Sequence, residues 1–380
     1  MRRVLLLLCA GALACGPSES TAPAAVPELA RKAGGPSPVT IVNLGLSGSG
    51  EDSQPWSIND GGSIVGLRGS WDEPFKAFLW SPDAPRATSG AVLDLPGLGP
   101  GEASAMSINN ASQVVGYSLG ASGSRAFLYD GAVHDLGLPD GWTSSYAHGI
   151  NEGTPRIVVG AVERSAPSAR AAAVWTVSAA GAGYSVSASG PLTGLGGAAS
   201  EAFGVNGTGT VVGAADNAAG QQRPVRWAAG TLAPVELGVL AGHSQGYAYG
   251  INAAGTVVGH SAGSGCPVAV VWASGGTAPA ALPGLGGCSS QARSINDAGD
   301  IAGYATRKRG GARAVIWRSS GAGYSVTELG SLSGSASSQA TGLNEPVAVT
   351  GGTSVELVGW STTGAQAHRA TLWTVFRPAP

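Results

Sequence analysis

The sequence predicts an all-β protein, a seven-bladed β-propeller with four-stranded blades. Three observations lead to this fold class: one short motif recurs seven times, each repeat holds four short strand candidates between turn residues, and the two ends of the repeat array complement each other. Each repeat is about 42 to 56 residues long, which fits four short strands with their turns. One such unit cannot cover both faces of its own sheet, so neighbouring units must stack.

The first 14 residues have the pattern of a signal peptide. Arg2 and Arg3 precede an apolar run, 4–14, that is too short to cross a bilayer. Ala12-Leu13-Ala14 comes directly before Cys15, and this order resembles the lipobox of bacterial lipoproteins, in which the cysteine becomes the lipidated first residue. We therefore expect lipidation at Cys15, with ordinary cleavage after the same three residues as the alternative.

The segment after the signal predicts a tether and then a single domain. Residues 15–38 are rich in Pro, Ala, Ser and Gly without periodicity, which is typical of a flexible linker. Residues 39–375 carry the repeats, and 376–380 form a short tail. We expect an exported monomer: a lipoprotein of the bacterial outer membrane or cell surface, held only by its N-terminal lipid, or a secreted protein if Cys15 is not lipidated.

Each repeat is anchored by an Asn after a short apolar run and by a Gly after a second apolar pair. The Asn residues are Asn59, Asn109, Asn151, Asn206, Asn252, Asn296 and Asn344. The Gly residues are Gly66, Gly116, Gly160, Gly213, Gly259, Gly303 and Gly359. Because Asn readily bonds its own backbone in tight turns, the interval predicts a hairpin between the first and second strands. In the seventh repeat this interval is longer, and PVAVTGGT (346–353) predicts an insertion in the hairpin.

The predicted third strand of each repeat ends in an aromatic residue. The segments are AFLW (77–80), AFLY (126–129), AAVW (172–175), PVRW (224–227), AVVW (269–272), AVIW (314–317) and ATLW (370–373). We expect the recurring Trp to fill the wedge between neighbouring blades, where its burial stabilises the fold by roughly 2–3 kcal/mol. The fourth strand then leads to a Leu-Pro or Leu-Gly step, as in VLDLPGLG (92–99).

The ends of the array predict how the ring closes. The seventh repeat stops at Trp373-Thr374-Val375, after its third strand, whereas VTIVNLG (39–45) is a strand with no repeat before it. Pairing of these two segments would complete the last blade with both ends of the domain. Closure of this kind also removes exposed sheet edges.

These residues resemble a named family. The order D-L-G-x-L-G-G, S-x-A-x-G-I-N-x-x-G-x-V-V-G and A-F-L-W is similar to that of the HAF repeat family of bacterial extracellular repeat proteins. The fullest matches are FGVNGTGTVVG (203–213) and SINDAGDIAG (294–303), and the name-giving triplet is present as KAF (76–78) and RAF (125–127). The resemblance covers 39–375 and implies an exported repeat protein, and it brings no catalytic residues with it.

Two cysteines remain in the domain, Cys266 and Cys288. In a propeller, the loops that join second and third strands lie on the same face as the loops that lead into the next repeat. Cys266 and Cys288 lie in two such loops of adjacent repeats, so we predict a disulfide between them. Two buried free thiols are the alternative.

Little in the sequence predicts catalysis or cofactor binding. Charged residues make up 12% of the chain against the usual ~25%, and the net charge of −2 gives no general attraction to nucleic acid. The five His residues form no metal-binding spacing, no G-x-S-x-G segment lies on a predicted strand-to-helix turn, and no phosphate-binding loop is present. We therefore predict neither a metal nor a cofactor.

Several residues outside the repeat pattern gather on the predicted face of the two cysteines. They are Trp71, Trp142, His243, Arg307, Lys308 and Arg309. Exposed aromatic residues beside polar groups suit recognition of a carbohydrate or a peptide. The alternative is that Trp71 and Trp142 pack against neighbouring loops and that the basic trio 307–309 is a solvated turn. We expect a non-catalytic binding or interaction module for a glycan or protein partner.

Two alternatives to a binding module remain open. One is a hydrolase or lyase of an extracellular polymer, and the other is a structural spacer. The acid–base candidates for the enzyme are Asp72, Glu73, Asp140 and His243.

Overall fold

The computed structural model describes most of the repeat domain. The described residues are 39–46, 51–70, 72–120, 122–165, 167–180, 183–231, 233–319, 323–333, 335–362 and 367–379. The chain divides after Ser37, and all described residues lie in the second unit, Pro38–Pro380. The predicted signal peptide, Cys15, the tether and Trp71 lie outside the described residues.

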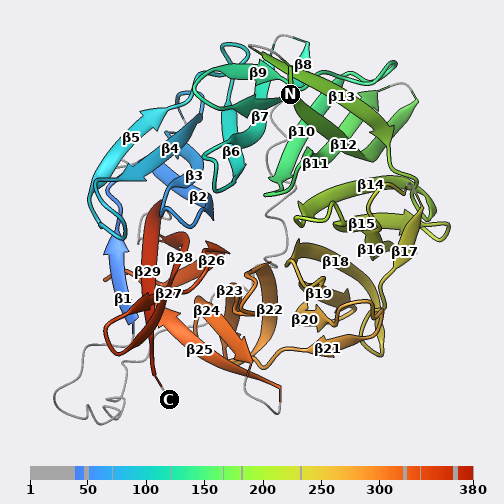
Figure 1. Cartoon of the computed structure of the whole chain (residues 1–380). Coiled ribbons are helices and arrows are strands. Elements are labelled where there is room, and N and C mark those ends of the chain that lie inside the picture. The colour runs from blue at the N-terminus through green and yellow to red at the C-terminus, as the bar shows by residue number, and fades with distance from the viewer. Residues whose placement is uncertain are drawn as a thin grey trace. The chain divides into compact units, whose positions relative to one another are not determined.

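The described secondary structure is all strand, arranged around a common centre with the first strand of each repeat innermost (Figure 1). The innermost strands are β2 (Asp52–Ile58), β6 (Ala103–Ile108), β10 (Ser144–Ile150), β14 (Gly196–Val205), β18 (His243–Ile251), β22 (Gly286–Ile295) and β26 (Ser337–Leu343). The second strands are β3 (Ile64–Gly69), β7 (Val114–Gly120), β11 (Arg156–Ser165), β15 (Val211–Asn217), β19 (Val257–Gly263), β23 (Ile301–Arg307) and β28 (Gly352–Thr362).

The outer part of each repeat is formed by its third and fourth strands. The third strands are β4 (Lys76–Pro82), β8 (Gly123–Tyr129), β12 (Ser168–Ala180), β16 (Gln222–Trp227), β20 (Val268–Trp272), β24 (Ala312–Ser319) and β29 (His368–Pro378). The outermost strands are β5 (Gly90–Asp94), β9 (Val133–Asp135), β13 (Gly183–Pro191), β17 (Pro234–Glu236), β21 (Pro279–Ala281), β25 (Tyr324–Gly330) and β1 (Val39–Asn43). This order is that of a β-propeller.

The prediction of seven separate four-stranded blades is wrong. The described strands form six hydrogen-bonded sheets. Five are separate blades, four of them with four strands and one with five, whereas the sixth is a continuous eight-stranded sheet that spans the third and fourth repeats. The merger depends on β12, which at 13 residues is the longest described strand and pairs in parallel with β14 through Arg170 and Ala199.

The predicted closure is confirmed. β1 pairs antiparallel with β29, from Val39 opposite Val375 to Asn43 opposite Thr371. The N-terminal strand therefore completes the sheet of the seventh repeat. The predicted insertion is also present as β27 (Val347–Val349), which pairs with the extended start of β28.

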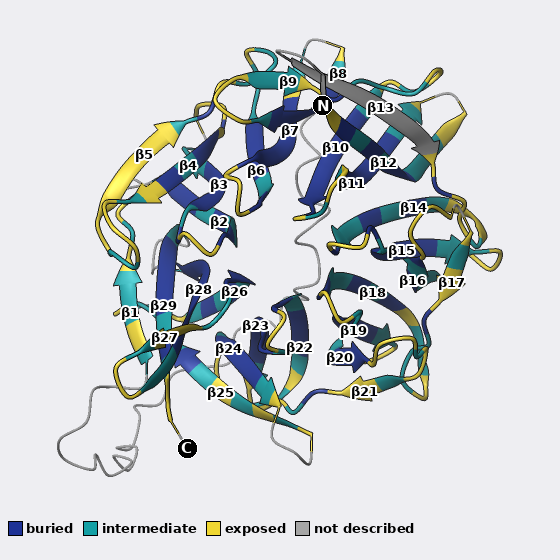
Figure 2. Ribbon diagram, in the orientation of Figure 1, coloured by how far each residue is buried: buried dark blue, intermediate teal, exposed yellow. Residues whose placement is uncertain are grey.

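The core lies between repeats, as expected for the recurring Trp. Figure 2 shows burial concentrated on the second and third strands of the repeats and exposure on the outermost ones. Trp317 is fully buried and packs against Val258 and Leu282 of the preceding repeat. Trp272 donates from Nε1 to the carbonyl of Gly238, 3.0 Å away, also across a repeat boundary. The Trp residues therefore join neighbouring repeats by apolar contact and, at such positions, by a hydrogen bond.

The recurring Asn residues form a ladder from one repeat to the next. The side chain of Asn252 accepts a hydrogen bond from the Thr256 N–H at 2.9 Å, which closes its own hairpin. Its Nδ2 donates to the carbonyl of Asn296 in the next repeat, at 3.1 Å. The same cross-repeat bond joins Asn59 to Asn109, Asn109 to Asn151, Asn206 to Asn252 and Asn296 to Asn344. Asn is needed here because its side chain both donates and accepts, whereas an ionised Asp only accepts.

Candidate functional site

The recurring Gly of the second strand shapes the innermost strand beside it. A Cβ on Gly259 would lie 1.8 Å from the carbonyl oxygen of Tyr247, and the equivalent distances in the other repeats are no more than 2.1 Å. Directly after this close approach the innermost strand bulges: Ala248 pairs with Gly259 and Gly250 with Val258, so Tyr249 has no ladder partner. Bulges of this kind redirect a side chain out of the regular alternation of a strand.

The same bulge occurs in all seven repeats and always three residues before the recurring Asn. The bulged residues are Trp56, Met106, His148, Phe203, Tyr249, Arg293 and Thr341. We refer to these seven residues as the channel ring. All of them line a cavity at the centre of the innermost strands, with a volume of about 210 Å³. Since pockets for drug-sized ligands measure about 300–1,000 Å³, this cavity suits a single small ring or side chain.

The channel ring was missed by the sequence analysis, although the sequence carries a signal for it. The positions on either side of the bulge are almost uniform, for example Ala248 before and Gly250 after, with Ala and Gly or Ser at most equivalent places. The bulged position itself ranges from Thr to Trp and Arg. Variation at one place within a uniform repeat marks a position that the scaffold leaves free for function.

Aromatic rings follow one another along one side of the channel ring. The ring centroids of His148 and Phe203 are 5.9 Å apart, and those of Phe203 and Tyr249 are 5.3 Å apart. The Arg293 guanidinium lies 4.6 Å from the centroid of Tyr249, in cation–π contact. Four consecutive repeats therefore present one connected wall of rings that ends in a cation.

Two polar side chains of the channel ring have buried atoms without a hydrogen-bond partner in the described part of the chain. Trp56 lacks one at Nε1, and His148 lacks one at Nδ1. Nε2 of His148 lies 2.7 Å from Oε1 of Glu201, within ion-pair distance, although the two atoms do not form a directed hydrogen bond. Buried donors without partners are rare, so these atoms indicate an incomplete polar environment around the channel.

Glu201 connects the channel ring to an ion-pair network beneath it. Burial alone would raise the pKa of Glu201, but the neighbouring His148 and Arg170 hold this pKa down at about 2. Arg170 binds Glu201 through two nitrogens, at 2.5 and 3.1 Å, and also contacts Glu163. Glu201 is therefore ionised and already occupied by two partners, which makes it a support for His148 rather than an acid–base group.

A second histidine lies behind the aromatic wall. His260 stacks on Tyr247, with ring centroids 4.9 Å apart, and is 5% exposed. Burial, together with the charge of Arg293, lowers the pKa of His260 to about 3. His260 is therefore neutral at physiological pH and packs as an aromatic ring.

The residues expected on the loop face, the face of the two cysteines, are mostly engaged with neighbours. Trp142 is partly buried against the core of its repeat, with the Arg164 guanidinium 5.1 Å from its ring centroid. His243 contacts the hydroxyl of Ser261 at 2.8 Å through Nδ1. The contacts of Trp142 match the packing alternative that the sequence left open.

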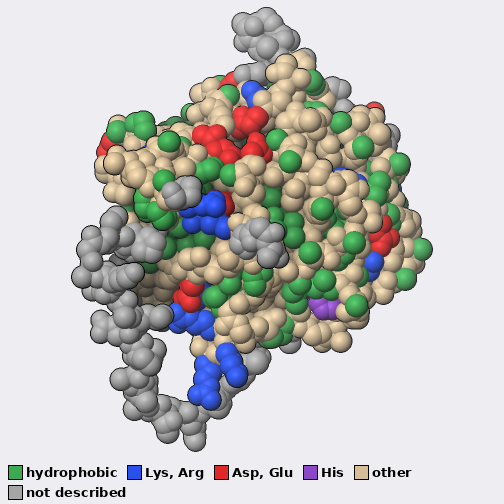
Figure 3. Space-filling model, turned by 60° about the horizontal axis from the view of Figure 1, so that its bottom comes forward, with side chains coloured by type: hydrophobic (Ala, Val, Ile, Leu, Met, Phe, Trp, Pro, Cys, Tyr) green, Lys and Arg blue, Asp and Glu red, His purple; other side chains and the backbone are tan. Residues whose placement is uncertain are grey.

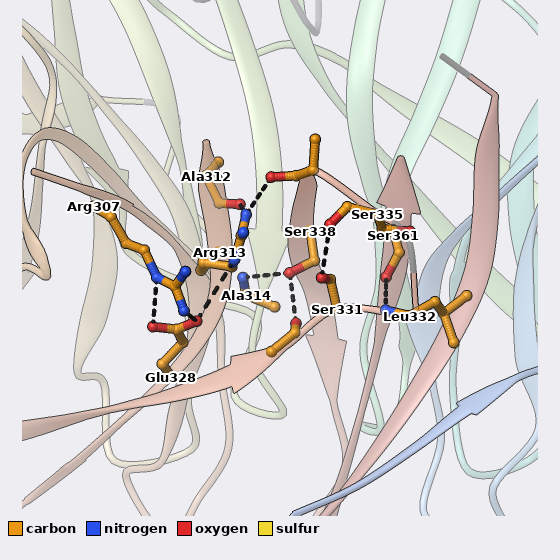
Figure 4. Close-up of polar contacts among 12 residues, drawn as sticks. Arg307, Ala312, Arg313, Ala314, Glu328, Ser331, Leu332, Ser335, Ser338 and Ser361 are labelled. Atoms are coloured by element: carbon orange, nitrogen blue, oxygen red, sulfur yellow. Dashed lines mark hydrogen bonds and ion pairs between the residues drawn. The ribbon is translucent and has the colours of Figure 1, made fainter. Parts of the chain in front are cut away.

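Of the three basic residues on the loop face, one is paired with an acidic side chain and two are exposed to solvent. Arg307 forms a two-point ion pair with Glu328, at 2.5 and 3.0 Å (Figure 4). Arg313 approaches the same carboxylate at 3.6 Å. Lys308 and Arg309 are exposed. Asp72, Glu73 and Asp140, the predicted acid–base candidates, are exposed as well, and none of them lines the central cavity.

The predicted disulfide is confirmed. Cys266 and Cys288 are bonded, with their Cα atoms 5.5 Å apart. Cys266 precedes β20 and Cys288 lies in β22, so the bond joins adjacent repeats on the loop face. The positions of the two loops on one face of the propeller therefore place these two cysteines within bonding distance.

A second cavity lies where the third and fourth repeats merge. It has a volume of about 510 Å³, and its wall includes Thr143, Glu163, Arg164 and Arg170. Thr143 follows Trp142, so this cavity adjoins the one described aromatic residue predicted for the loop face. Within the described residues, no cluster of three or more His, Cys, Asp or Glu is arranged to hold a metal ion. Nor does any helix in that part of the chain have the length and apolar character needed to span a membrane.

Comparisons with known proteins assign no specific activity to the chain. No family model and no curated protein matches the chain. The β-propeller domain of the Trilobed protease from Pyrococcus furiosus is similar, with 10% identity over 85% of this chain and 92% of that chain and a TM-score of 0.48. A protein of unknown function from Dyadobacter fermentans shares 11% identity over 90% of this chain and 100% of that chain, with a TM-score of 0.45.

A peptidase shows the same degree of likeness. The acylaminoacyl peptidase from Pyrococcus horikoshii is 10% identical over 86% of this chain and 52% of that chain, with a TM-score of 0.49. The chain thus spans about half the length of the peptidase. At this level of identity the likeness concerns the fold alone.

Proposed function

We propose that the protein is an exported, non-catalytic binding module and that its channel ring holds a sugar residue of an extracellular glycan. The observation that carries this proposal is the ring itself: seven bulges present seven different side chains to one cavity, and four of them are aromatic rings, His148 included. Aromatic faces beside a few polar donors are the usual surroundings of a bound sugar or other small ring. The cavity volume of about 210 Å³ fits one such ring.

The composition of the cavity favours binding over hydrolysis. None of the residues that line it is Asp or Glu, whereas glycoside hydrolysis uses a pair of carboxyl groups flanking the bond that breaks. Glu201, the nearest acidic residue described beside the ring, is ionised and paired with Arg170. A hydrolase or lyase therefore has less support than a binding module.

Export, membrane attachment and the family resemblance belong to the same proposal. The Cys266–Cys288 disulfide supports export, because disulfides persist mainly in oxidising compartments. Attachment through a lipid on Cys15 rests on the sequence pattern, as does membership of the HAF repeat family.

The exposed hydrophobic residues of the described segments are scattered and do not form a large apolar docking patch, which favours a ligand site in the channel. In Figure 3 hydrophobic side chains are spread over the visible face, and acidic side chains form one larger group with others scattered elsewhere. The large hydrophobic residues that are exposed, among those described, are Val92, Leu93, Leu119, Val235 and Val347. All five lie on outer strands, at strand ends or in the β27 hairpin rather than in the channel.

The test is a binding screen of the exported protein against soluble cell-wall and extracellular polysaccharides, followed by titration calorimetry of any ligand found. Tyr249→Ala should weaken binding, because it removes the ring of the aromatic wall that contacts Arg293. Trp142→Ala should leave binding unchanged, because Trp142 lies on the loop face. Binding that is lost in Trp142→Ala and kept in Tyr249→Ala would move the site to the loop-face cavity. No binding to any glycan would refute the proposal.

A further inference from the structure

Two polar side chains of the channel ring, Arg293 and the Trp56 indole, can only donate hydrogen bonds. The single hydroxyl hydrogen of Thr341 is shared between the carbonyl oxygens of Pro55 and Val358, at 2.8 and 3.1 Å. With no Asp or Glu in its wall, the cavity has one fixed positive charge and no negative one.

Arg293 is the group in this ring that lacks a partner of opposite charge. It lies half-buried over Tyr249, and in the described part of the chain no acidic residue forms an ion pair with it. By contrast, Arg170, Arg223 and Arg307 each contact a carboxylate at ion-pair distance. Tyr249 holds the guanidinium in place through its ring face, which leaves the N–H groups of Arg293 free to donate.

A buried donor points to the same kind of ligand. The Trp56 Nε1, which can only donate, is buried without a hydrogen-bond partner in the described part of the chain. A buried donor without a partner indicates a missing acceptor, and the oxygens of an anion are acceptors.

From these observations we infer that the channel ring recognises a negatively charged sugar residue, with its carboxylate or sulfate paired to Arg293 and its ring packed on the Phe203–Tyr249 wall. This inference rests on the proposed function, because it assumes that the channel holds a sugar. A planar guanidinium binds carboxylate and sulfate oxygens through two parallel N–H groups. One acidic sugar residue combines the small ring that the cavity volume allows with the anion that the donors require.

The experiment compares charged and neutral forms of one ligand on the exported protein. The probes are an oligogalacturonate and its fully methyl-esterified form, and a sulfated dextran oligosaccharide and plain dextran, each titrated at low and at moderate salt. A short acidic peptide is the third arm. The variants are Arg293→Gln, Arg293→Lys and, as the matched control, Arg307→Gln on the loop face. Thermal unfolding of each variant establishes that the protein is folded.

We expect one of the charged oligosaccharides to bind at least tenfold more tightly than its neutral form, with affinity falling as salt rises. Arg293→Gln should weaken that binding by about 10- to 100-fold, which is the loss expected for hydrogen bonds to a charged group. Arg293→Lys should retain part of the affinity, and Arg307→Gln should retain all of it. Comparison of the oligogalacturonate with the sulfated dextran shows whether the site prefers a carboxylate or a sulfate.

The other outcomes overturn the inference in distinguishable ways. If charged and neutral oligosaccharides bind equally and Arg293→Gln has no effect, the channel binds a sugar but does not recognise its negative charge. The proposed function then holds and the further inference is refuted. Tighter, Arg293-dependent binding of the acidic peptide replaces the sugar by a protein partner. No binding in any arm removes the proposed function together with the inference.

Discussion

The ladder of Asn side chains gives a prediction whose size follows from the structure. Asn252 is 6% exposed and makes two side-chain hydrogen bonds: one within its hairpin, to Thr256 N–H, and one to the carbonyl of Asn296 in the next repeat. Asn252→Ala removes both. Each lost bond costs about 1 kcal/mol net, and the half-buried Thr256 N–H left without a partner adds about 1 kcal/mol. The expected loss is therefore about 2–3 kcal/mol.

Asn252→Asp keeps the hydrogen bond within the hairpin and removes the one to the next repeat. The carboxylate still accepts from Thr256 N–H, but it cannot donate to Asn296 and instead places a buried charge beside that carbonyl oxygen. Burial should raise the pKa of the new carboxyl above that of an unfolded Asp. A raised folded-state pKa means that the variant loses stability as pH rises through and above about 4. Asn252→Asp should therefore approach the wild type at acid pH, whereas Asn252→Ala should show the same deficit at every pH.

Differential scanning calorimetry between pH 4 and pH 8 measures both effects. A loss of 1 kcal/mol lowers Tm by about 2–4 °C in domains of 150–250 residues and by less in a longer one. Asn217→Ala gives the cost of bonds within a turn alone, because Asn217 accepts from Ala219 N–H and Gln221 N–H at 3.0 Å each and donates to Gln221 Oε1 at 3.1 Å. If Asn252→Ala costs less than about 1 kcal/mol, the within-hairpin and cross-repeat bonds contribute less than the structure predicts and the reasoning is refuted.

Four further predictions concern the core, the bulge, the disulfide and pH. Trp272→Ala should destabilise the fold by about 3–5 kcal/mol, because Trp272 is fully buried between repeats; a loss under 1 kcal/mol in chemical denaturation would contradict this. Gly259→Ala should lower Tm and weaken ligand binding together, because its methyl group would lie 1.8 Å from a carbonyl oxygen beside the bulge; unchanged binding would show that the bulge does not position Tyr249. Removal of the disulfide by Cys266→Ala with Cys288→Ala should cost about 3 kcal/mol, given the separation of 22 residues, and calorimetry with and without reductant checks this. The pKa of Glu201 is held at about 2, below its ordinary value of 4.5, so its stabilising contribution is present above pH 4.5 and is lost as pH falls toward 2; Glu201→Gln should flatten this part of the acid-unfolding curve.

Most of the architecture follows from features that repeat locally in the sequence. The strands, the closure by 39–43, the insertion at β27 and the burial of Trp317 all depend on spacing and residue type within one repeat or at the ends of the array. The disulfide was predictable for the same reason, because the antiparallel order of the strands assigns every loop to one face.

The partners of the loop-face residues could not be predicted from the local sequence. The sequence around Arg307 shows no partner for its charge, but in the structure Arg307 is paired with Glu328, 21 residues further along the chain. Trp142 similarly packs against its own core and Arg164. The sequence gives the types of these residues and not their neighbours, and the neighbours decide whether a charge or a ring is free to bind.

The sequence by itself therefore determined the β-propeller class, the strands of each repeat and the way in which the chain ends join, since these depend on periodic burial and turn chemistry. Only the tertiary structure decided that the third and fourth repeats share one sheet, because the parallel bridge between Arg170 and Ala199 joins residues of two different repeats. It also decided the candidate site. Residues from Trp56 to Thr341 are far apart along the chain, and only the ring of innermost strands, each with its bulge opposite a Gly, brings them to one cavity.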